Sequence, residues 1–510
     1  MGKQCVINVD LADLFEEPER KGFLHTLAWG DYVEVLETKP THLRVRGVKY
    51  EKREDGSILP VSTEAYIWPK KSSGIKPADV VIPRKENRVL KVNFVDVQQG
   101  DGAVIESPEG KVMLIDGGDN QLFARYLAAR FNGTSVAKPK EIACILVTHG
   151  DADHFAGLTR IHDSETNKEP RKRLFIAPKR VYHNGLVKRP EKDANKKSIP
   201  EKAMLGATRQ VGADTVITEL VDSLLDVDDA DMNLPFRQWK AALADWNGRS
   251  AIEFRRMSFG QDDAFEFLGE EGIQVSVLGP FLTGSGKDQG LKFLGSPPAG
   301  PRVGHESLDV DAGTFKGFSA SHTINGHSVV LRLQYGKFSY LFSGDLNDEA
   351  GRILARKQQE GEINLRSEVF KVPHHGSADF SGAFIQMVSP VVSVVSSGDE
   401  SARKEYIHPR ATLMGTLGKY SRVEEPLIFV TELVAFINLE GYAHLTDAKA
   451  DKKRGEFYAF SRTAYGMVKT RTDGERLLVY TDSGKADMKE AYCYTLDEKH
   501  GPVPAAVLRV

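Results

Sequence analysis

The chain has very few cysteines. Cys5, Cys144 and Cys493 are the only three in 510 residues, and they lie far apart. Three scattered cysteines cannot form a disulfide framework. Cys144 falls inside an apolar run, Ile142–Val147, which predicts a buried thiol of low reactivity. We therefore expect no disulfide scaffold and no cysteine nucleophile.

The sequence also lacks any apolar stretch long enough to cross a bilayer. Its first residues, MGKQCVINVDLADLFEE, have neither the basic nor the apolar region of a secretory signal. Together with the scarcity of cysteine, these absences predict a cytoplasmic protein with no membrane partner.

An excess of charge of one sign is missing as well. The chain has 68 Lys and Arg against 71 Asp and Glu, a formal net charge of −3. This balance excludes a uniformly basic nucleic-acid binder, although it averages over local patches. With 510 residues and 41% hydrophobic residues, the chain is long enough for a large core and more than one domain.

Against these absences stands one dense cluster of polar residues. His149, Asp151, Asp153 and His154 follow directly after the apolar run Ile142–Val147. Such a run, ended by Gly and Asp, predicts a buried strand followed by a turn. Imidazole and carboxylate groups at this density suit a divalent cation. The alternative, that Asp151 and Asp153 cap a helix, accounts for neither histidine.

Three later apolar segments also end in residues that bind metals. YLFSGD ends at Asp345, VFKVPHHGS contains His374 and His375, and Val391–Asp399 is followed by His408. Asp345 is placed to bridge two ions. Two cations that share a carboxylate lower the pKa of a bound water and neutralise charge on a phosphodiester.

The order of these motifs resembles the metallo-β-lactamase fold. They are preceded by FVDVQQGDG (Phe94–Gly102) and MLIDGG (Met113–Gly118). Within that superfamily the chain most resembles the nuclease-type domain of ComEC-type DNA-uptake proteins, as a free-standing member. The resemblance covers about residues 90–440 and implies an α/β fold, an αββα sandwich.

The resemblance also implies roles for individual residues. The metal ligands would be His149, Asp151, Asp153, His154 and Asp345, completed by His374 or His375. Asp116 would orient a ligand from below the site. Asp153, His408 and Ser377 would take part in catalysis, the last two by stabilising the leaving oxygen or the phosphorus centre.

Two departures from the superfamily leave assignments open. Asp151 stands where the wider superfamily has a third histidine, and oxygen-rich sites favour harder ions. We therefore expect two divalent ions, manganese or zinc, with magnesium also acceptable. The ligand between the first motif and Asp345 is not fixed, because His322, Asn325 and His327 are all candidates; we expect Asn325 and His327 to support the site.

The pattern along the chain predicts four regions. Residues 1–75 form a small β module that resembles an SH3-like module, with a hairpin around Lys39-Pro40. Residues 76–89 form an exposed linker, 90–440 the hydrolase with an insertion at about 159–300, and 441–510 a β-rich extension that packs on the hydrolase. Thr472-Asp473-Gly474 predicts a hairpin turn in this extension.

The insertion begins with basic residues and has acidic runs later. The basic part predicts either a groove for phosphates, with His183 near the site, or an ordinary solvated surface. The basic residues are Arg171, Lys172, Arg173, Lys179, Arg180, Lys188, Arg189, Lys192, Lys196 and Lys197.

Three functions fit these observations. The first is a metal-dependent phosphodiesterase, a nuclease acting on DNA through a metal-bound hydroxide. The second keeps the fold but acts on a small phosphodiester, such as a cyclic nucleotide or a phosphocholine-type compound. The third is an effector hydrolase held inactive by its N-terminal module, with a regulatory partner that binds the module or the linker.

Overall fold

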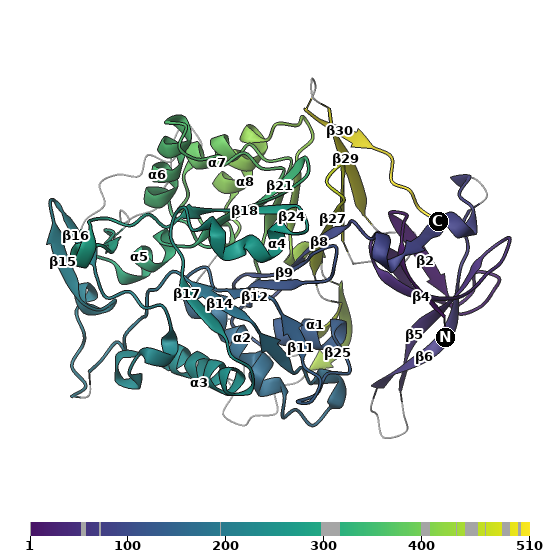
Figure 1. The fold of residues 1–510 in the computed structure, drawn as a ribbon, viewed down its shortest axis with the longest axis horizontal. Helices are drawn as coiled ribbons and strands as arrows, with labels where there is room; N and C mark the ends of the chain where they lie inside the picture. Colours follow the sequence, from purple (N-terminus) through teal and green to yellow (C-terminus); the bar gives the residue numbers. More distant parts are fainter. Residues whose placement is uncertain are drawn as a thin grey trace.

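The computed structural model describes residues 2–52, 58–70, 73–193, 195–296, 317–398, 408–434, 436–443, 457–464, 466–481, 490–497 and 501–510. Two large β-sheets pack face to face, and helices cover their outer faces (Figure 1). The fold is therefore the αββα sandwich that the resemblance predicted. No helix in these described ranges is both long and apolar enough to cross a membrane.

The first sheet has ten strands. Their order is β17 (Glu253–Arg256), β14 (Arg180–His183), β12 (Cys144–Leu146), β10 (Val112–Asp116), β9 (Gly102–Glu106), β8 (Leu90–Val95), β27 (Met467–Thr472), β28 (Arg476–Thr481), β29 (Ala491–Asp497) and β30 (Gly501–Ala505). The helices α1 (Leu122–Arg130), α2 (Ala152–Ser164) and α3 (Leu234–Arg249) share one apolar cluster with this sheet.

The second sheet has six strands. Their order is β18 (Ile273–Gly279), β20 (Val330–Tyr335), β21 (Phe338–Phe342), β22 (Val369–Lys371), β23 (Val392–Val395) and β24 (Leu427–Val430). Its outer face is covered by α6 (Asp348–Gln359), α7 (Gly382–Val388) and α8 (Ala411–Tyr420). The short helices α4 (Glu266–Gly269) and α5 (Ala320–Gly326) lie before β18 and β20.

Alternation along single strands explains how the layers are joined. In β10, Met113 and Ile115 belong to the cluster between the two sheets, whereas Val112 and Leu114 belong to the cluster beneath the helices. Successive side chains of a strand point to opposite faces, so an apolar strand buries both of its faces. This is why the strands before the metal-binding motifs are continuously apolar.

The N-terminal module is a seven-stranded sheet. Its order is β3 (Phe23–Ala28), β2 (Leu11–Phe15), β6 (Ile58–Ile67), β5 (Leu43–Lys52), β4 (Tyr32–Thr38), β1 (Lys3–Ile7) and β7 (Val81–Pro83). The predicted hairpin is confirmed, since β4 pairs with β5. The exposed linker predicted for 76–89 is not observed, because β7 pairs with β1 and Val80 is fully buried in the core of the module.

The C-terminal extension and the insertion both contribute strands to the two main sheets, which the sequence did not predict. β27 pairs with β8, so the strands after residue 466 continue the first sheet, and the predicted hairpin turn at Thr472–Gly474 joins β27 to β28. Within 159–300, β14, β17 and β18 are strands of the two main sheets. What lies outside the sandwich there is mainly a small sheet of β15 (Thr208–Val211), β16 (Asp214–Ile217) and β19 (Leu291–Lys292).

Two further pairs complete the described strands: β11 (Lys140–Ile142) with β13 (Ile176–Pro178), and β25 (Phe436–Ala443) with β26 (Phe457–Ala464). The module contacts the hydrolase through an apolar cluster that includes Trp29, Leu478 and Tyr480. Asp10 is fully buried and accepts from Arg476 at 2.8 Å. The two chain ends lie on this side of the molecule (Figure 1).

Candidate metal centre

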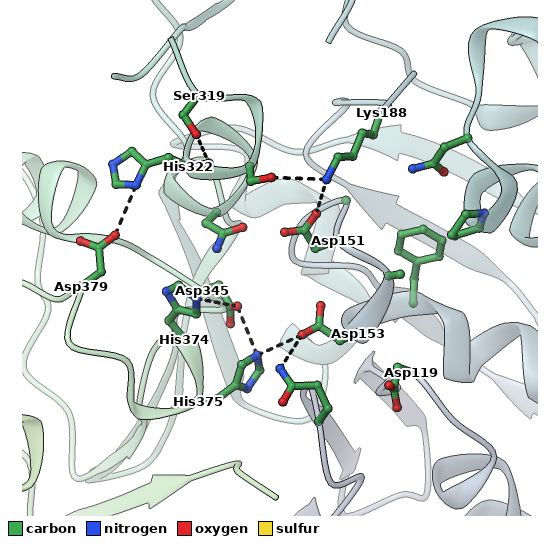
Figure 2. Close-up of a pocket in the computed structure, with 18 of the residues that line it drawn as sticks. Asp119, Asp151, Asp153, Lys188, Ser319, His322, Asp345, His374, His375 and Asp379 are labelled. Atoms are coloured by element: carbon green, nitrogen blue, oxygen red, sulfur yellow. Dashed lines mark hydrogen bonds and ion pairs between the residues drawn. The ribbon is translucent and has the colours of Figure 1, made fainter. Parts of the chain in front are cut away.

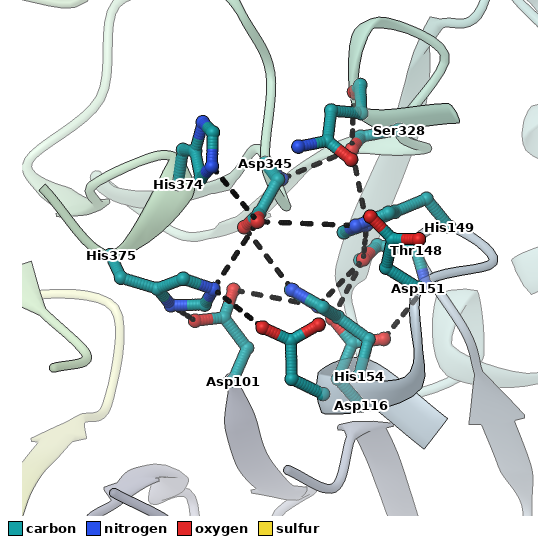
Figure 3. Close-up of polar contacts among 12 residues, drawn as sticks. Asp101, Asp116, Thr148, His149, Asp151, His154, Ser328, Asp345, His374 and His375 are labelled. Carbon is teal, nitrogen blue, oxygen red and sulfur yellow. Dashed lines mark hydrogen bonds and ion pairs between the residues drawn. The ribbon is translucent and has the colours of Figure 1, made fainter. Parts of the chain in front are cut away.

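The predicted ligands meet because their strands end at one edge of the sandwich. β10 and β12 run parallel in the first sheet, and β21, β22 and β23 run parallel in the second. Asp116 ends β10, and the loop with His149 and His154 follows β12. Asp345 and His375 follow β21 and β22. Carboxyl ends of parallel strands share an edge, which brings these side chains together (Figure 3).

Asp345 lies at the centre of the cluster. Its Oδ1 is 3.2 Å from Nε2 of His154, and its Oδ2 is 3.2 Å from Nε2 of His375 and 3.9 Å from Nε2 of His149. Three imidazoles from both halves of the sandwich thus face one carboxylate.

The cluster fits a bound cation. Nε2 of His149, His154 and His375 and Oδ1 of Asp345 are buried, with no hydrogen-bond partner in the described part of the chain. Unpaired buried polar atoms are costly, so their convergence needs a reason. Ligand atoms of His149, His154 and Asp345 lie within 4.8 Å of one another, as do those of Asp153, His154 and His375. These are the donor types and the spacing that divalent metals require.

The pKa values show how unequal the ring environments are. Burial, with His154 nearby, lowers the pKa of His149 to about 3. Burial also opposes protonation of His154, but Asp345 and Asp116 outweigh it and hold its pKa well above the ordinary value. Burial opposes ionisation of Asp345, yet His375 and His154 hold its pKa well below the ordinary value. The cluster therefore concentrates negative charge that a cation would neutralise.

Asp116 supports His154 from beneath the cluster. Its Oδ2 lies 2.9 Å from His154 Nδ1, while the backbone amide and the hydroxyl of Thr148 donate to its two oxygens at 2.8 and 2.7 Å. An imidazole whose Nδ1–H is held in this way presents the lone pair of Nε2 to a metal. Asp116 therefore lies behind His154, on the side of the ring that faces away from Asp345.

Asp153 and Asp151 differ in how many of their carboxylate oxygens already contact other side chains. Asp153 Oδ2 lies 3.6 Å from His375 Nε2 and accepts from the Gln99 amide at 3.0 Å. Asp151 Oδ1 lies 3.3 Å from Lys188 Nζ, and in the amide orientation that satisfies its neighbours Asn325 donates to Asp151 Oδ2 at 3.0 Å. Both oxygens of Asp151 are thus engaged, and it belongs to none of the convergent groups of described residues.

The two adjacent histidines have different positions. His375 directs Nε2 at Asp345 and Asp153, and its Nδ1 donates to the Ser396 carbonyl at 3.1 Å. His374 is more open, with Nε2 3.9 Å from Asp345 Oδ2 and its ring 6.0 Å from that of His408. His375 is therefore the better ligand, and His374 faces the cavity.

The two residues predicted to assist the leaving group are separated. His408 lines the cavity, and burial lowers its pKa to about 4. Ser377 is not among the described lining residues, and its hydroxyl accepts from the Asp379 amide at 3.2 Å. His408 therefore lies at the site, whereas the Ser377 hydroxyl stabilises the turn after His375.

Two predicted histidines lie away from the cluster. His183 accepts from the Gly185 amide through Nδ1 and donates to the Asp222 carbonyl through Nε2, so both ring nitrogens serve the local loop. His327 donates to the Lys292 carbonyl at 2.7 Å. Burial lowers the pKa of both rings to about 4. The contacts of His183 and His327 are therefore with nearby loops, and neither ring contacts the cluster through them.

Asn325 and His322 lie where the cavity opens. Asn325 contacts Asp151, as a supporting residue would. His322 lies 3.2 Å from Asp379 through Nδ1, and both residues line the cavity (Figure 2). His322 and His327 are in no convergent group of the described residues, so neither of these two candidates for the intermediate ligand joins the cluster.

Sequence reasoning missed Asp101 and Lys371. Asp101 Oδ1 lies 3.3 Å from His375 Nδ1, and Lys371 Nζ contacts Asp101 Oδ2. Both lie within motifs already noted, FVDVQQGDG and VFKVPHHGS. Their spacing gives no sign of the pairing, because the residues come from different sheets.

Asp153, Asp345 and His375 of the cluster line a cavity of about 620 Å³, and His149 and His154 lie buried behind them. Its lining includes the carboxylates of Asp119, Asp151, Asp153, Asp345 and Asp379, the imidazoles of His322, His374, His375 and His408, and the ammonium group of Lys188 (Figure 2). A cavity of this size admits a small ligand or one unit of a polymer.

Comparisons with known proteins agree with the geometry. A profile described as the metallo-beta-lactamase superfamily matches residues 95–175. ComE operon protein 3 of Bacillus subtilis (strain 168) is 31% identical over 100 residues, 19% of this chain and 12% of that protein. Competence protein ComA of Neisseria gonorrhoeae is 41% identical over 86 residues, 17% of this chain and 12% of that protein. The similarity thus spans about an eighth of each relative.

Proposed function

We propose that this chain, whose hydrolase domain is of the metallo-β-lactamase superfamily and resembles ComEC-type proteins, is a metal-dependent phosphodiesterase that cleaves DNA. One observation carries the proposal. Nitrogens of His149, His154 and His375 that have no hydrogen-bond partner in the described part of the chain converge on Asp345, which lines an open cavity together with His375. A purely structural cluster of buried polar atoms would instead give each of them a hydrogen-bond partner.

The residues fit two divalent ions, with manganese or zinc expected and magnesium acceptable. His149, His154 and Asp345 would hold one ion, and Asp153, His375 and Asp345 the other. Bound there, the metals would supply Lewis acidity and an activated water for attack on phosphorus. Asp116 fixes His154 by accepting from its Nδ1–H.

Residues around the opening would orient the diester. Lys188 is the only ammonium or guanidinium group among the described lining residues, and it lies 3.3 Å from Asp151 and 3.4 Å from the Ser321 hydroxyl. It is placed to attract a phosphate oxygen at the cavity wall. His408, with a pKa of about 4, is neutral at neutral pH, so we assign it a hydrogen bond to the departing oxygen.

A small phosphodiester is the second candidate substrate. It is favoured because many basic residues of the predicted phosphate groove are already paired with carboxylates. Six of the ten are paired: Arg171 and Lys172 with Glu169, Lys179 with Glu141, Arg180 with Glu253, Lys188 with Asp151, and Arg189 with Glu219. Paired cations attract a polyanion less than free ones do. The cavity is also of the size that suits a small ligand.

The third hypothesis is an effector hydrolase that its N-terminal module holds inactive. In this structure the module would have to inhibit the hydrolase without covering the cavity. None of the described residues of the module, 2–52, 58–70 and 73–83, lines the cavity. A regulatory partner that binds the module stays a proposal, as does a cytoplasmic location.

The test is hydrolysis by the purified full chain of bis(p-nitrophenyl) phosphate and of linear, circular and single-stranded DNA, with and without added Mn²⁺. The inactive variant is Asp153→Ala with His154→Ala. His162→Ala is the matched control, because His162 lies on the same helix and contacts Asp245 at the surface.

Metal-dependent cleavage of DNA, lost in the double variant and kept in His162→Ala, would support the nuclease. Cleavage of the small diester alone would favour the second candidate. If neither substrate is cleaved with Mn²⁺, Zn²⁺ or Mg²⁺, phosphodiester hydrolysis is the wrong activity.

A further inference from the structure

A buried ion pair joins the two sheets directly beneath the cluster. Asp101 follows β8 in the first sheet, and Lys371 is the last residue of β22 in the second. Lys371 Nζ contacts Asp101 Oδ2, and their side chains are 5% and 7% exposed. Removing two charges from water is costly, so such a pair is seldom present for stability alone.

Asp101 also contacts one histidine from each half of the site. Its Oδ1 lies 3.3 Å from Nδ1 of His375, and its Oδ2 lies 4.0 Å from Nδ1 of His154 (Figure 3). Since Nδ1 is the nitrogen that faces away from Asp345, Asp101 lies behind these rings. This is the position from which a carboxylate sets the tautomer and the direction of a metal-binding imidazole.

His375 needs such support more than His154 does. Its backbone has φ 51°, in the left-handed region that residues other than glycine seldom adopt. The Ser396 carbonyl, 3.1 Å from His375 Nδ1, is its other described anchor, and Ser396 is held in turn by its hydroxyl, which donates to the Gly100 carbonyl at 2.9 Å. The β8–β9 loop thus holds His375 through both Ser396 and Asp101.

The charge of Asp101 must be cancelled from within the protein. The cavity bordered by Asp101, Asp116 and Lys371 measures about 10 Å³. This is the lower limit of the about 10–15 Å³ that one water needs, so there is little room for solvent around these groups. Lys371 therefore compensates the carboxylate, and Asp101 orients His375 without adding net negative charge beneath a site for an anionic diester.

We propose that Asp101 is a positioning residue for His375 and that Lys371 is its charge-compensating partner. This proposal rests on the metal centre of the proposed function. It does not depend on which diester is cleaved, because the test measures metal binding.

The test compares two uncharged versions of the pair that have nearly the same shape. In Asp101→Asn with Lys371→Met, an amide oxygen can still face His375 Nδ1 from the position of Asp101 Oδ1. In Asp101→Leu with Lys371→Met, residue 101 offers no oxygen, and the Ser396 carbonyl is the described acceptor that remains. For each metal-free chain, Mn²⁺ affinity is measured by isothermal titration calorimetry, the visible spectrum is recorded after Co²⁺ loading, and the melting temperature is measured.

We expect the Asn version to bind Mn²⁺ within about threefold of the natural chain, and the Leu version about 10- to 100-fold more weakly with an altered Co²⁺ spectrum. Equal affinities and spectra for the two versions would overturn the positioning role. If neither the natural chain nor any variant binds Mn²⁺ or Co²⁺, the metal centre itself fails, which is a separate result.

Two single variants complete the design. Lys371→Met alone should melt below the Asn version, because it leaves a buried carboxylate uncompensated; a melting temperature equal to or above that of the Asn version would overturn the role of Lys371. Glu106→Gln breaks another buried pair, Lys91–Glu106 at 2.8 Å, away from the cluster. It should lower the melting temperature and leave Mn²⁺ affinity unchanged.

Discussion

Asp116 Oδ2 lies 2.9 Å from Nδ1 of His154, so the ring that faces Asp345 is fixed by a carboxylate on its far side. Thr148 in turn holds Asp116 through its amide and its hydroxyl. The direction of one ligand thus depends on the end of β10 and on the loop after β12. Several outcomes can be expected from this arrangement and from the rest of the fold.

Asp116→Asn should reduce metal affinity and turnover by about 10- to 100-fold while the chain stays folded. Asn tolerates the φ of 57° at this position, but its amide nitrogen would face His154 Nδ1 and disfavour the required tautomer. Calorimetric Mn²⁺ titration and diester hydrolysis measure the two effects. The control is Asp163→Asn, at an exposed residue of α2. An Asp116→Asn chain with natural affinity would show that Asp116 does not orient the ring.

Asp345→Ala should lower kcat by at least about 100-fold, since the carboxylate shared by the ions contributes several kcal/mol. The metal-free chain should stay folded but lose some stability, because the change removes the carboxylate that His154 and His375 face at 3.2 Å. Circular dichroism and kcat are compared with those of Asp214→Ala, a half-exposed residue paired with Lys292. Unchanged turnover in folded Asp345→Ala would rule out a mechanism with a bridging carboxylate.

Metal removal should lower the melting temperature, and metal addition should raise it. A ligand at about 100 times its Kd stabilises a fold by about 2.7 kcal/mol. The unpaired atoms of His149, His154 and His375 are the groups that would gain partners. Thermal melts with EDTA, Mn²⁺ and Zn²⁺ test this, with His154→Ala as the variant that should respond least. A melting temperature insensitive to all three additions would argue against a bound ion.

Glu106 should make the chain acid-sensitive. Burial opposes its ionisation, but Arg130 and Lys91 outweigh burial and lower its pKa from 4.5. A carboxylate with a lowered folded pKa stabilises the protein above its unfolded pKa, and this contribution is lost as the pH falls below about 4.5. Glu106→Gln should therefore cost about 3 kcal/mol at pH 7.5 and progressively less below pH 4.5.

Urea unfolding of the two chains at pH 7.5, 5 and 4 measures this difference. A difference that grows towards acid would contradict the direction assigned to Glu106. Because both chains keep the same metal-site groups, the contribution of those groups cancels in the comparison.

Asp10→Ala tests whether the module restrains the hydrolase. Asp10 accepts from Arg476 at 2.8 Å and from the Leu508 amide at 2.6 Å, so its loss should cost about 1–3 kcal/mol. We expect kcat/KM to stay the same, because the junction lies away from the cavity. A clear rise in activity would instead support inhibition by the module.

Much of the site could be predicted because its signals are local. Apolar strands that end in HGDADH, GD and HHGS place their ligands at one edge wherever the strands run parallel. His375 could not be separated from His374 in this way, since the choice depends on a left-handed turn and on Ser396. Asp151 was predicted as a ligand from its position in the motif, whereas its contacts with Lys188 and Asn325 come from distant segments.

The structure of the regions outside the motifs was harder to predict, because it also depends on contacts between segments that are distant in the sequence. Val81–Pro83 is short and follows a polar stretch, yet it becomes a strand because β1 offers it an edge. β14, β17 and β18 were placed in an insertion, because single short strands do not show which sheet they join. The pairing of Asp101 with Lys371 is likewise a consequence of how the two sheets meet.

The junction of β8 and β27 has a consequence for biosynthesis. Thr470 pairs with Val92, which lies 378 residues earlier. At about 5–20 residues per second, a ribosome needs on the order of 20–75 s to make that stretch. Until then β8 has an unpaired edge, which other strands can join. A nascent chain therefore passes through a long aggregation-prone interval, and folding yield should depend on translation speed and on chaperones that cover this edge.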